Sequence, residues 1–507
     1  MVENTFEKRK KKVWNWLKKP NNFVLVAILV FAFAIRLYYF ILTKSQPLWW
    51  DEASYGSLAK NLLHHAWDNM PGIVGETVIR PPLFPLLWAF LVMFGLPEVG
   101  VRFILEFIPS VLAVFFVYLA GKELYNKRIG LIAAFIFSVL WIHLFYTCRL
   151  LTNVPALPFI FLSVYYFVKA TKGEFNAKWF AISLILLSIS SLIRYPNGLI
   201  FFVYLLFLII MFRVDLVKKS SFWISGFIGL IPMFLFFIYN FVTKGNIFPA
   251  VLGSDYITSG TEAAKPIAFG LLKFIRIYLG GWGNPFLIFF LVGIGFVIFE
   301  LVVGYDLIRK RGRLQSHLFL LLLLVLIYAY FVFYLRVAED RWLFATSFPL
   351  ACLSAFGFSY VYGLLKKYQK TLAAVVILVL LAWGAYAQVK TADPLIKSKA
   401  ESFLEMRQGF EWIKENTPED AIISGSGIDV YSLYYAERIY NRINDKFSVS
   451  DTIESDYVVI HAFTPHPSSL YEYLSINQDK WSPVMALFFD KAQTEPAFVV
   501  YRSTINV

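Results

Sequence analysis

The chain has 507 residues, of which 58% are hydrophobic and 16% charged, and its mean hydropathy is +0.62. Soluble domains carry about 25% charged residues, so the composition excludes a water-soluble globule and predicts a polytopic membrane protein. A formal net charge of +13 is compatible with nucleic acid, anionic lipid or basic membrane loops as partners, and the position of the charges decides among them.

Apolar runs long enough to cross a bilayer recur along most of the chain, and we expect about eleven membrane helices. The first run follows a basic tail, residues 1–22, and has the length of an uncleaved signal anchor. The runs begin near Phe23, Val99, Ile129, Val154, Trp179, Gly198, Phe222, Pro285, His317, Trp342 and Thr371.

Lys and Arg collect in every second loop, as the positive-inside rule requires if the basic tail is cytoplasmic. The long first outer loop, residues 43–98, carries only Lys44, Lys60 and Arg80. We therefore expect a multi-pass protein of the cell membrane with a cytoplasmic N-terminus. Nucleic acid is not an expected partner, because the basic residues follow the topology and do not form one face.

Residues 390–507 then lie outside the cytoplasm, and their composition differs from the rest. Residues 402–416 have the pattern of an amphipathic helix, and the apolar runs at 421–424, 457–460 and 498–501 are typical of buried strands. The predicted fold class is an all-α membrane domain over residues 23–389, followed by a small extracytoplasmic α/β domain.

Two adjacent carboxylates stand where the first outer loop leaves the membrane, in Trp49-Trp50-Asp51-Glu52. Apolar residues at helical spacing follow from Tyr55, so we expect a helix along the membrane surface. Asp51 and Glu52 could bind a divalent cation such as Mg²⁺ or Mn²⁺, or accept a proton from a hydroxyl group. The alternative is that Asp51 caps the helix and Glu52 favours its positive N-terminal end.

Arginines mark the other outer connections. Arg80 precedes a proline pair, and Arg149 and Arg194 stand at membrane depth, where a charge is costly unless it is paired. An anionic ligand would supply the partner for these two. Arg80 is suited to a phosphate, because the planar guanidinium donates two parallel hydrogen bonds. Each arginine alone could instead extend to lipid headgroups. Arg341 lies in a short loop of two acids and two bases, which could be a self-neutralising turn.

Several short motifs occur in a fixed order: Trp49-Trp50-Asp51-Glu52-Ala53-x-Tyr55, Arg80-Pro81-Pro82-Leu83, Val101-Arg102-Phe103, Tyr146-x-x-Arg149-x-x-x-Asn153-x-Pro155, Arg194-Tyr195-Pro196 and Arg341-Trp342. Together they resemble the dolichyl-phosphate-mannose-protein mannosyltransferase superfamily, which includes lipid A aminoarabinose transferase and has the GT-C membrane fold. The resemblance covers most of the chain.

This resemblance implies a glycosyltransferase that moves a hexose or pentose from a polyprenyl-phosphate donor to a glycan, lipid or protein acceptor on the outer membrane face. Asp51 matches the acid proposed as general base or metal-associated residue, and Glu52 its partner. Arg80, Arg149 and Arg194 match basic positions near the donor phosphate. Since no nucleophile for a covalent glycosyl-enzyme is evident, we expect inversion at the anomeric carbon.

Three further residues fall on the motifs as possible supporting groups: Tyr55, Asn153 and Arg341. Asn153 stands where many members of the superfamily have Asp, so the second acidic ligand of a divalent cation is missing.

Two other classes of protein fit parts of the pattern. A transporter or flippase for an anionic, lipid-linked substrate would also place arginines at membrane depth. A non-catalytic scaffold would use the outer domain for protein contacts and would tolerate changes at Asp51 and Arg80.

Overall fold

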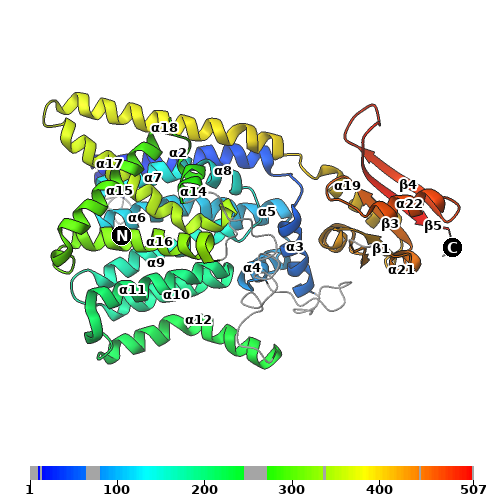
Figure 1. The fold of residues 1–507 in the computed structure, drawn as a ribbon, viewed down its shortest axis with the longest axis horizontal. Helices are drawn as coiled ribbons and strands as arrows, with labels where there is room; N and C mark the ends of the chain where they lie inside the picture. Colours follow the sequence, from blue (N-terminus) through cyan, green and yellow to red (C-terminus); the bar gives the residue numbers. More distant parts are fainter. Residues whose placement is uncertain are drawn as a thin grey trace, which may run out of the picture. The chain divides into compact units, whose positions relative to one another are not determined.

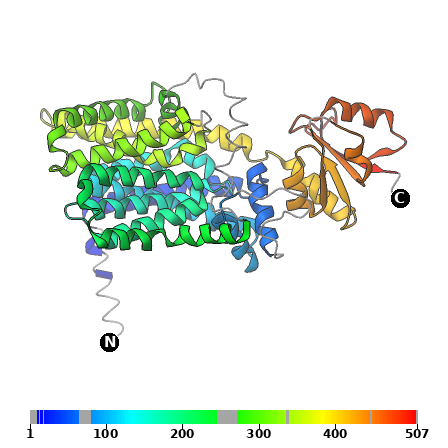
Figure 2. The same cartoon turned by 60° about the horizontal axis from the view of Figure 1, so that its bottom comes forward.

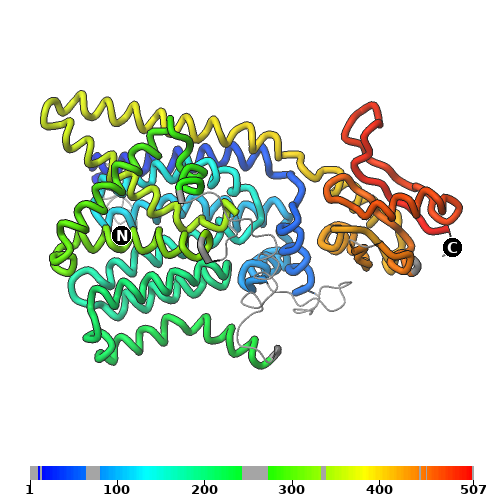
Figure 3. The backbone as a smooth tube through the Cα atoms, in the orientation of Figure 1, coloured from blue at the N-terminus to red at the C-terminus, as the bar shows by residue number. Residues whose placement is uncertain are grey.

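A computed structural model describes residues 10–11, 14–16, 18–63, 80–244, 271–334, 339–444 and 447–504. Parts of the expected basic tail and of the expected first outer loop therefore lie outside the described residues. The chain forms two compact units, which Figures 1 and 3 trace from blue to red. The helical unit comprises residues 1–41, 103–148 and 152–396, and the mixed unit comprises residues 42–102, 149–151 and 397–507.

Long apolar helices make up the helical unit. In the described part of the chain, nine helical stretches are long and apolar enough to cross a membrane. The helices of this unit are α2 (Pro20–Thr43), α6 (Ile108–Leu124), α7 (Lys127–Val139), α8 (Trp141–Tyr146), α9 (Asn153–Thr171), α10 (Ala177–Ile193), α11 (Leu199–Phe212), α12 (Ser220–Lys244), α14 (Leu271–Leu279), α15 (Pro285–Val303), α16 (Gly312–Tyr328), α17 (Ser347–Leu365) and α18 (Lys370–Lys399).

The nine stretches correspond to nine of the expected spans, and the two others are shorter than these nine. The run near Trp179 is α10, with 17 residues. The run near Ile129 is divided, because α7 ends after 13 residues where Leu140 takes an extended ψ of 119°, and α8 follows. The expected domain boundary at 389/390 falls inside α18 and stays a prediction.

Glycines allow the closest helix contacts in this unit. A Cβ atom on Gly293 of α15 would lie 2.1 Å from the carbonyl oxygen of Leu353, and one on Gly357 of α17 would lie 2.0 Å from that of Phe289. Only glycine lets the backbones of α15 and α17 approach this closely. Small residues of this kind allow close van der Waals packing between membrane helices, which the hydrophobic effect does not drive together in lipid.

The mixed unit contains a five-stranded sheet of order β2-β1-β3-β5-β4. Its strands are drawn in orange to red in Figure 2. Strand β1 is parallel to β2 and β3, and β5 is antiparallel to β3 and β4. The elements of the unit are α3 (Trp50–Leu63), α4 (Leu83–Met93), α5 (Glu98–Arg102), α19 (Leu404–Asn416), β1 (Ile422–Gly425), α20 (Asp429–Tyr431), β2 (Ile439–Arg442), α21 (Ser450–Ile453), β3 (Tyr457–His461), α22 (Ser468–Ile476), β4 (Trp481–Phe488) and β5 (Pro496–Ser503).

The predicted amphipathic helix and the three predicted strands are confirmed as α19, β1, β3 and β5. Strands β2 and β4 were not predicted. Both lie at the edges of the sheet, where most of their residues stay partly exposed, so no continuous apolar run marks them. One hydrophobic cluster of buried residues at the sheet consists of Ile443, Val458, Leu470, Leu474 and Trp481.

His461, at the end of β3, is held neutral by its surroundings. Its side chain is 2% exposed, and its Nε2 lies 3.0 Å from the carbonyl oxygen of Ser426. Burial, together with the neighbouring His466, lowers the pKa of His461 to about 4.

The mixed unit should therefore lose stability in weak acid. As the pH falls from 6.5 to 4, unfolded His461 binds a proton and folded His461 does not, so about 3 kcal/mol of the free energy of unfolding should be lost. Hydrogen exchange of the β3 amides in the full chain, corrected for intrinsic exchange, measures this loss. His461→Gln removes the titration and should flatten the profile over this interval; an unchanged slope would assign the acid sensitivity to other groups.

Candidate functional site

The acidic pair lies in the first turn of α3, and Glu52 is fully buried there. The backbone N–H of Trp49 donates to Glu52 Oε2 over 2.6 Å, and the backbone N–H of Leu150 donates to Oε1 over 2.6 Å. A carboxylate at this end of a helix is favoured by the free N–H groups and the helix dipole. Glu52 thus joins the start of α3 to residues 149–151, a segment far along the chain.

Arg149 completes this inner arrangement. Its NH1 lies 3.3 Å from Glu52 Oε2, with side-chain exposures of 2% and 0%. The guanidinium lies 3.3 Å from the ring centroid of Trp49, and its NH2 donates to the carbonyl oxygen of Lys399. A buried charge needs such partners. The sequence predicted that Arg149 must be paired, and in the structure its partner is the Glu52 carboxylate.

Asp51 and Arg80 form a second ion pair, at the surface of the unit. Arg80 NH2 lies 2.8 Å from Asp51 Oδ1, and the two side chains are 32% and 28% exposed. The guanidinium also lies over the ring of Tyr55, 5.2 Å from its centroid. This carboxylate and this cation are the accessible members of the predicted set in the mixed unit, since Glu52 and Arg149 are enclosed.

A buried network beside α3 was not predicted. Arg102 pairs with Glu98 over 2.9 Å and donates to the carbonyl oxygen of Gln46, and the Tyr434 hydroxyl donates to Glu98. Burial and the charge of Glu98 raise the pKa of Tyr434 well above its ordinary value, so the hydroxyl remains a donor. The separation of four residues between Glu98 and Arg102 is the signal from which this pair could have been inferred.

Helix α3 packs against residues that follow β1. Lys60 Nζ donates to the carbonyl oxygen of Tyr434 and to Glu437, each over 2.6 Å, and Ser57 donates to the carbonyl oxygen of Val430. A Cβ atom on Gly56 would lie 2.5 Å from the Tyr434 ring. The apolar pattern predicted that one face of α3 is buried. In the structure, polar residues of this helix such as Ser57 and Asn61 are buried as well.

The remaining predicted residues lie together in the helical unit. Asn153, the first residue of α9, donates to the carbonyl oxygen of Arg341 over 2.7 Å. Arg194, at the end of α10, donates to Thr152 Oγ1 and to the same carbonyl oxygen, each over 3.4 Å. An ionised Asp at this position could not form the hydrogen bond of Asn153 to Arg341, because a carboxylate has no N–H group to donate.

The acidic pair does not fit a divalent cation as it stands. Three protein donors occupy the two oxygens of Glu52, and Asp51 engages Arg80. Within the described ranges, no group of three or more His, Cys, Asp and Glu side chains could hold a metal ion. Hard cations take several oxygen ligands, so the arrangement of these residues supports the proton-accepting alternative better than the metal-binding one.

Comparison with known proteins agrees with the motifs. Residues 79–239 match the family described as dolichyl-phosphate-mannose-protein mannosyltransferase. This match confirms the predicted resemblance over these residues. No curated protein matches the chain significantly.

Solved structures of membrane glycosyltransferases are similar in fold to this chain. The archaeal oligosaccharyltransferase AglB from Archaeoglobus fulgidus, in complex with an inhibitory peptide and a dolichol-phosphate, is 16% identical with a TM-score of 0.62, covering 97% of this chain and 75% of its own. ArnT from Cupriavidus metallidurans, bound to undecaprenyl phosphate, is 10% identical with a TM-score of 0.60, covering 94% of this chain and 97% of its own.

An oligosaccharyltransferase from Archaeoglobus fulgidus in complex with Zn and sulfate is 16% identical with a TM-score of 0.59, covering 86% of this chain and 68% of its own. At these identities the likeness concerns the fold. The predicted fold class, a polytopic helical protein with a small C-terminal α/β domain, is confirmed. The chain is a multi-pass membrane protein whose fold is similar to those of these solved glycosyltransferases.

Proposed function

We propose that the protein transfers a sugar from a polyprenyl-phosphate donor to an acceptor at the extracytoplasmic membrane face by a single inverting displacement. The observation that carries the proposal is the accessible ion pair between Asp51 and Arg80, a proton acceptor and a phosphate-binding cation 2.8 Å apart. The family match and the prenyl phosphates bound in the AglB and ArnT complexes support the choice of donor.

In this proposal the resting ion pair opens when the donor binds. The lipid phosphate attracts Arg80, and Asp51 becomes free to accept the proton of the acceptor hydroxyl. The acceptor oxygen forms a bond to the anomeric carbon as the bond from that carbon to the phosphate oxygen breaks. The electron pair leaves with the lipid phosphate, whose charge Arg80 stabilises.

Glu52 acts in this scheme as a positioning residue. Its bonds to the N–H groups of Trp49 and Leu150 fix the start of α3, and therefore the place of Asp51 next in the chain. Arg149 neutralises Glu52 and stacks on Trp49. Arg194 is a further proposed contact to the donor phosphate. Together with Asn153 it donates to the carbonyl oxygen of Arg341. No step is assigned to a metal ion.

The orientation belongs to the same proposal. Basic residues at one end of the helical unit favour a cytoplasmic position for that end, with the N-terminus on the same side. Asp51 and Arg80 then face the outside of the cell membrane.

Incubation of the purified protein with a panel of polyprenyl-phosphate hexoses and pentoses tests the reaction. Mass spectrometry should detect free polyprenyl phosphate and a glycosylated glycan, lipid or protein when the matching acceptor is present. A transporter or flippase would release no lipid phosphate in detergent, and that result with every donor would exclude the transferase.

Arg80→Ala should chiefly weaken donor binding. Loss of a charged hydrogen bond of about 1.5–3 kcal/mol should raise the KM for the donor roughly 10- to 100-fold, with a smaller effect on kcat. Arg80→Lys keeps the charge and should recover part of the affinity. Arg502→Ala, on an exposed residue of β5, is the matched control. A donor KM in Arg80→Ala equal to that of this control would remove Arg80 from the donor site.

A further inference from the structure

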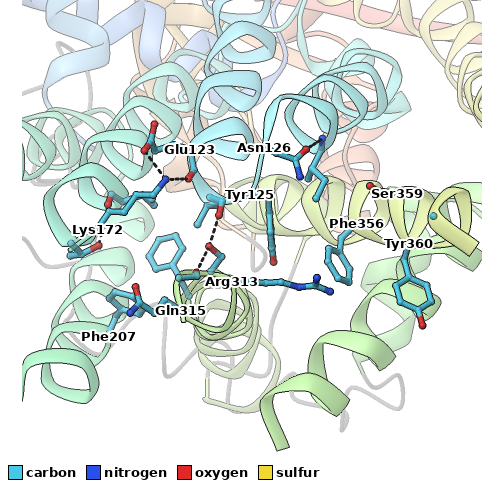
Figure 4. A pocket seen from close by; sticks show the side chains of 18 of the residues that line it. Glu123, Tyr125, Asn126, Lys172, Phe207, Arg313, Gln315, Phe356, Ser359 and Tyr360 are labelled. Carbon is cyan, nitrogen blue, oxygen red and sulfur yellow. Dashed lines mark hydrogen bonds and ion pairs between the residues drawn. The ribbon is translucent and has the colours of Figure 1, made fainter. Parts of the chain in front are cut away.

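A cavity of about 670 Å³ opens in the helical unit, among six helices. Figure 4 shows its lining, which comes from the C-terminal parts of α6, α9, α11 and α17 and the N-terminal parts of α7 and α16. Asn153 and Thr171 are the two ends of α9. Since α9 has 19 residues, Asn153 lies about 27 Å along this helix from the cavity. Arg194 contacts Thr152, beside that far end of α9.

Positive charge predominates in the lining. Lys172, Arg313 and Lys367 border the cavity, and Glu123 is the acid among its lining residues. Lys172 Nζ lies 3.1 Å from Glu123 Oε1, a pair that Figure 4 shows on one side of the cavity. Lys367 is exposed, and among the described residues its ammonium group has no hydrogen bond or ion pair.

Contacts with Glu300 and Phe356 hold Arg313 in place. Its guanidinium pairs with Glu300 and lies 5.2 Å from the ring centroid of Phe356, toward which it extends in Figure 4. The other oxygen of Glu300 lies 3.0 Å from His317 Nε2, and the opposite ring nitrogen of His317 lies 2.7 Å from the Tyr125 hydroxyl. This chain of contacts fixes the cation at the wall of the cavity.

The rest of the wall has two kinds of surface. Ile129, Val168, Phe207 and Phe319 supply apolar area, and neutral polar side chains such as Ser359 lie among the charged ones. A cavity of this size, with apolar walls and a few fixed charges, suits a small amphipathic ligand. Basic pockets between membrane helices are suited to anionic lipid headgroups.

We propose that this cavity binds the phosphodiester headgroup of an anionic phospholipid, with the glycerol and the first acyl carbons against the apolar wall. Lys367 and Arg313 contact the phosphate, and Lys172, shared with Glu123, adds to the positive potential. This proposal does not depend on the chemistry of the proposed transfer reaction.

Native mass spectrometry of the full-length protein, titrated with phosphatidylglycerol or phosphatidylcholine, tests the site. We expect phosphatidylglycerol to bind more tightly, and Lys367→Ala to weaken it about fivefold, the effect of one basic residue at an anionic lipid. Gly363→Leu should weaken it similarly without a change of charge, because Gly363 lines the cavity and a Cβ atom there meets open space. The matched control Lys310→Ala, exposed and outside the lining, should bind as the unchanged protein does.

Three results would overturn the proposal: equal binding of the two lipids, equal losses in Lys367→Ala and Lys310→Ala, or unchanged binding in Gly363→Leu. Displacement of phosphatidylglycerol by inorganic phosphate at similar concentration would assign the cavity to free phosphate instead. The Asp51→Asn variant should bind phosphatidylglycerol normally, so the outcome is independent of the transfer reaction.

Discussion

Asp51→Asn should lower the rate of sugar transfer by about 10³-fold, within the range lost when a general base is removed. Asparagine keeps the shape of the side chain and an oxygen that can accept from Arg80, but it cannot take the acceptor proton. Single-turnover release of the lipid phosphate at saturating donor measures the chemical step directly.

Donor binding separates this effect from misfolding. Because Arg80 no longer faces a carboxylate in Asp51→Asn, the donor should bind as tightly as before or more tightly. Asp420→Asn changes an exposed aspartate after α19 and should leave both rate and affinity unchanged. If Asp51→Asn retained most of its activity, Asp51 would not be the base.

Glu52→Ala should reduce the free energy of unfolding of the mixed unit by about 3–5 kcal/mol, the loss that follows when one partner of a buried ion pair is removed. The variant leaves the Arg149 guanidinium without its carboxylate and the N–H of Leu150 without its acceptor. Tryptophan fluorescence during chemical denaturation measures this loss, since Trp49 lies against Arg149.

Three comparisons identify the cause. Glu52→Gln keeps an acceptor oxygen and should lose less stability than Glu52→Ala. Glu52→Ala combined with Arg149→Met removes the unpaired charge and should recover part of the loss. Glu411→Ala breaks the exposed pair with Arg407, whose side chains are 45% and 32% exposed, and should cost less than about 1 kcal/mol. Equal losses in Glu411→Ala and Glu52→Ala would contradict a structural role for the buried pair.

The two ion pairs divide the predicted acids between different tasks. In the sequence, Asp51 and Glu52 are equivalent neighbours, each a candidate base or metal ligand. In the structure, Glu52 is enclosed with Arg149, and Asp51 stays partly exposed with Arg80. Their difference comes from the direction of the two side chains in the first turn of α3, which no spacing in the sequence specifies.

The sequence alone determined the features that depend on local composition. Apolar length predicted the membrane helices, period and turn residues predicted α19, β1, β3 and β5, and the ordered motifs indicated the mannosyltransferase family. Each of these follows from residues close together in the chain, because helix length and strand alternation are local properties.

Only the tertiary structure decided which distant groups meet. Arg149 pairs with Glu52 across 97 positions, and Lys60 reaches Glu437 across 377. The two edge strands, the division of α7 from α8 and the basic cavity also depend on packing between segments remote in sequence. Burial and charge pairing depend on that packing. A pattern of residues along one segment does not specify which remote segment packs against it.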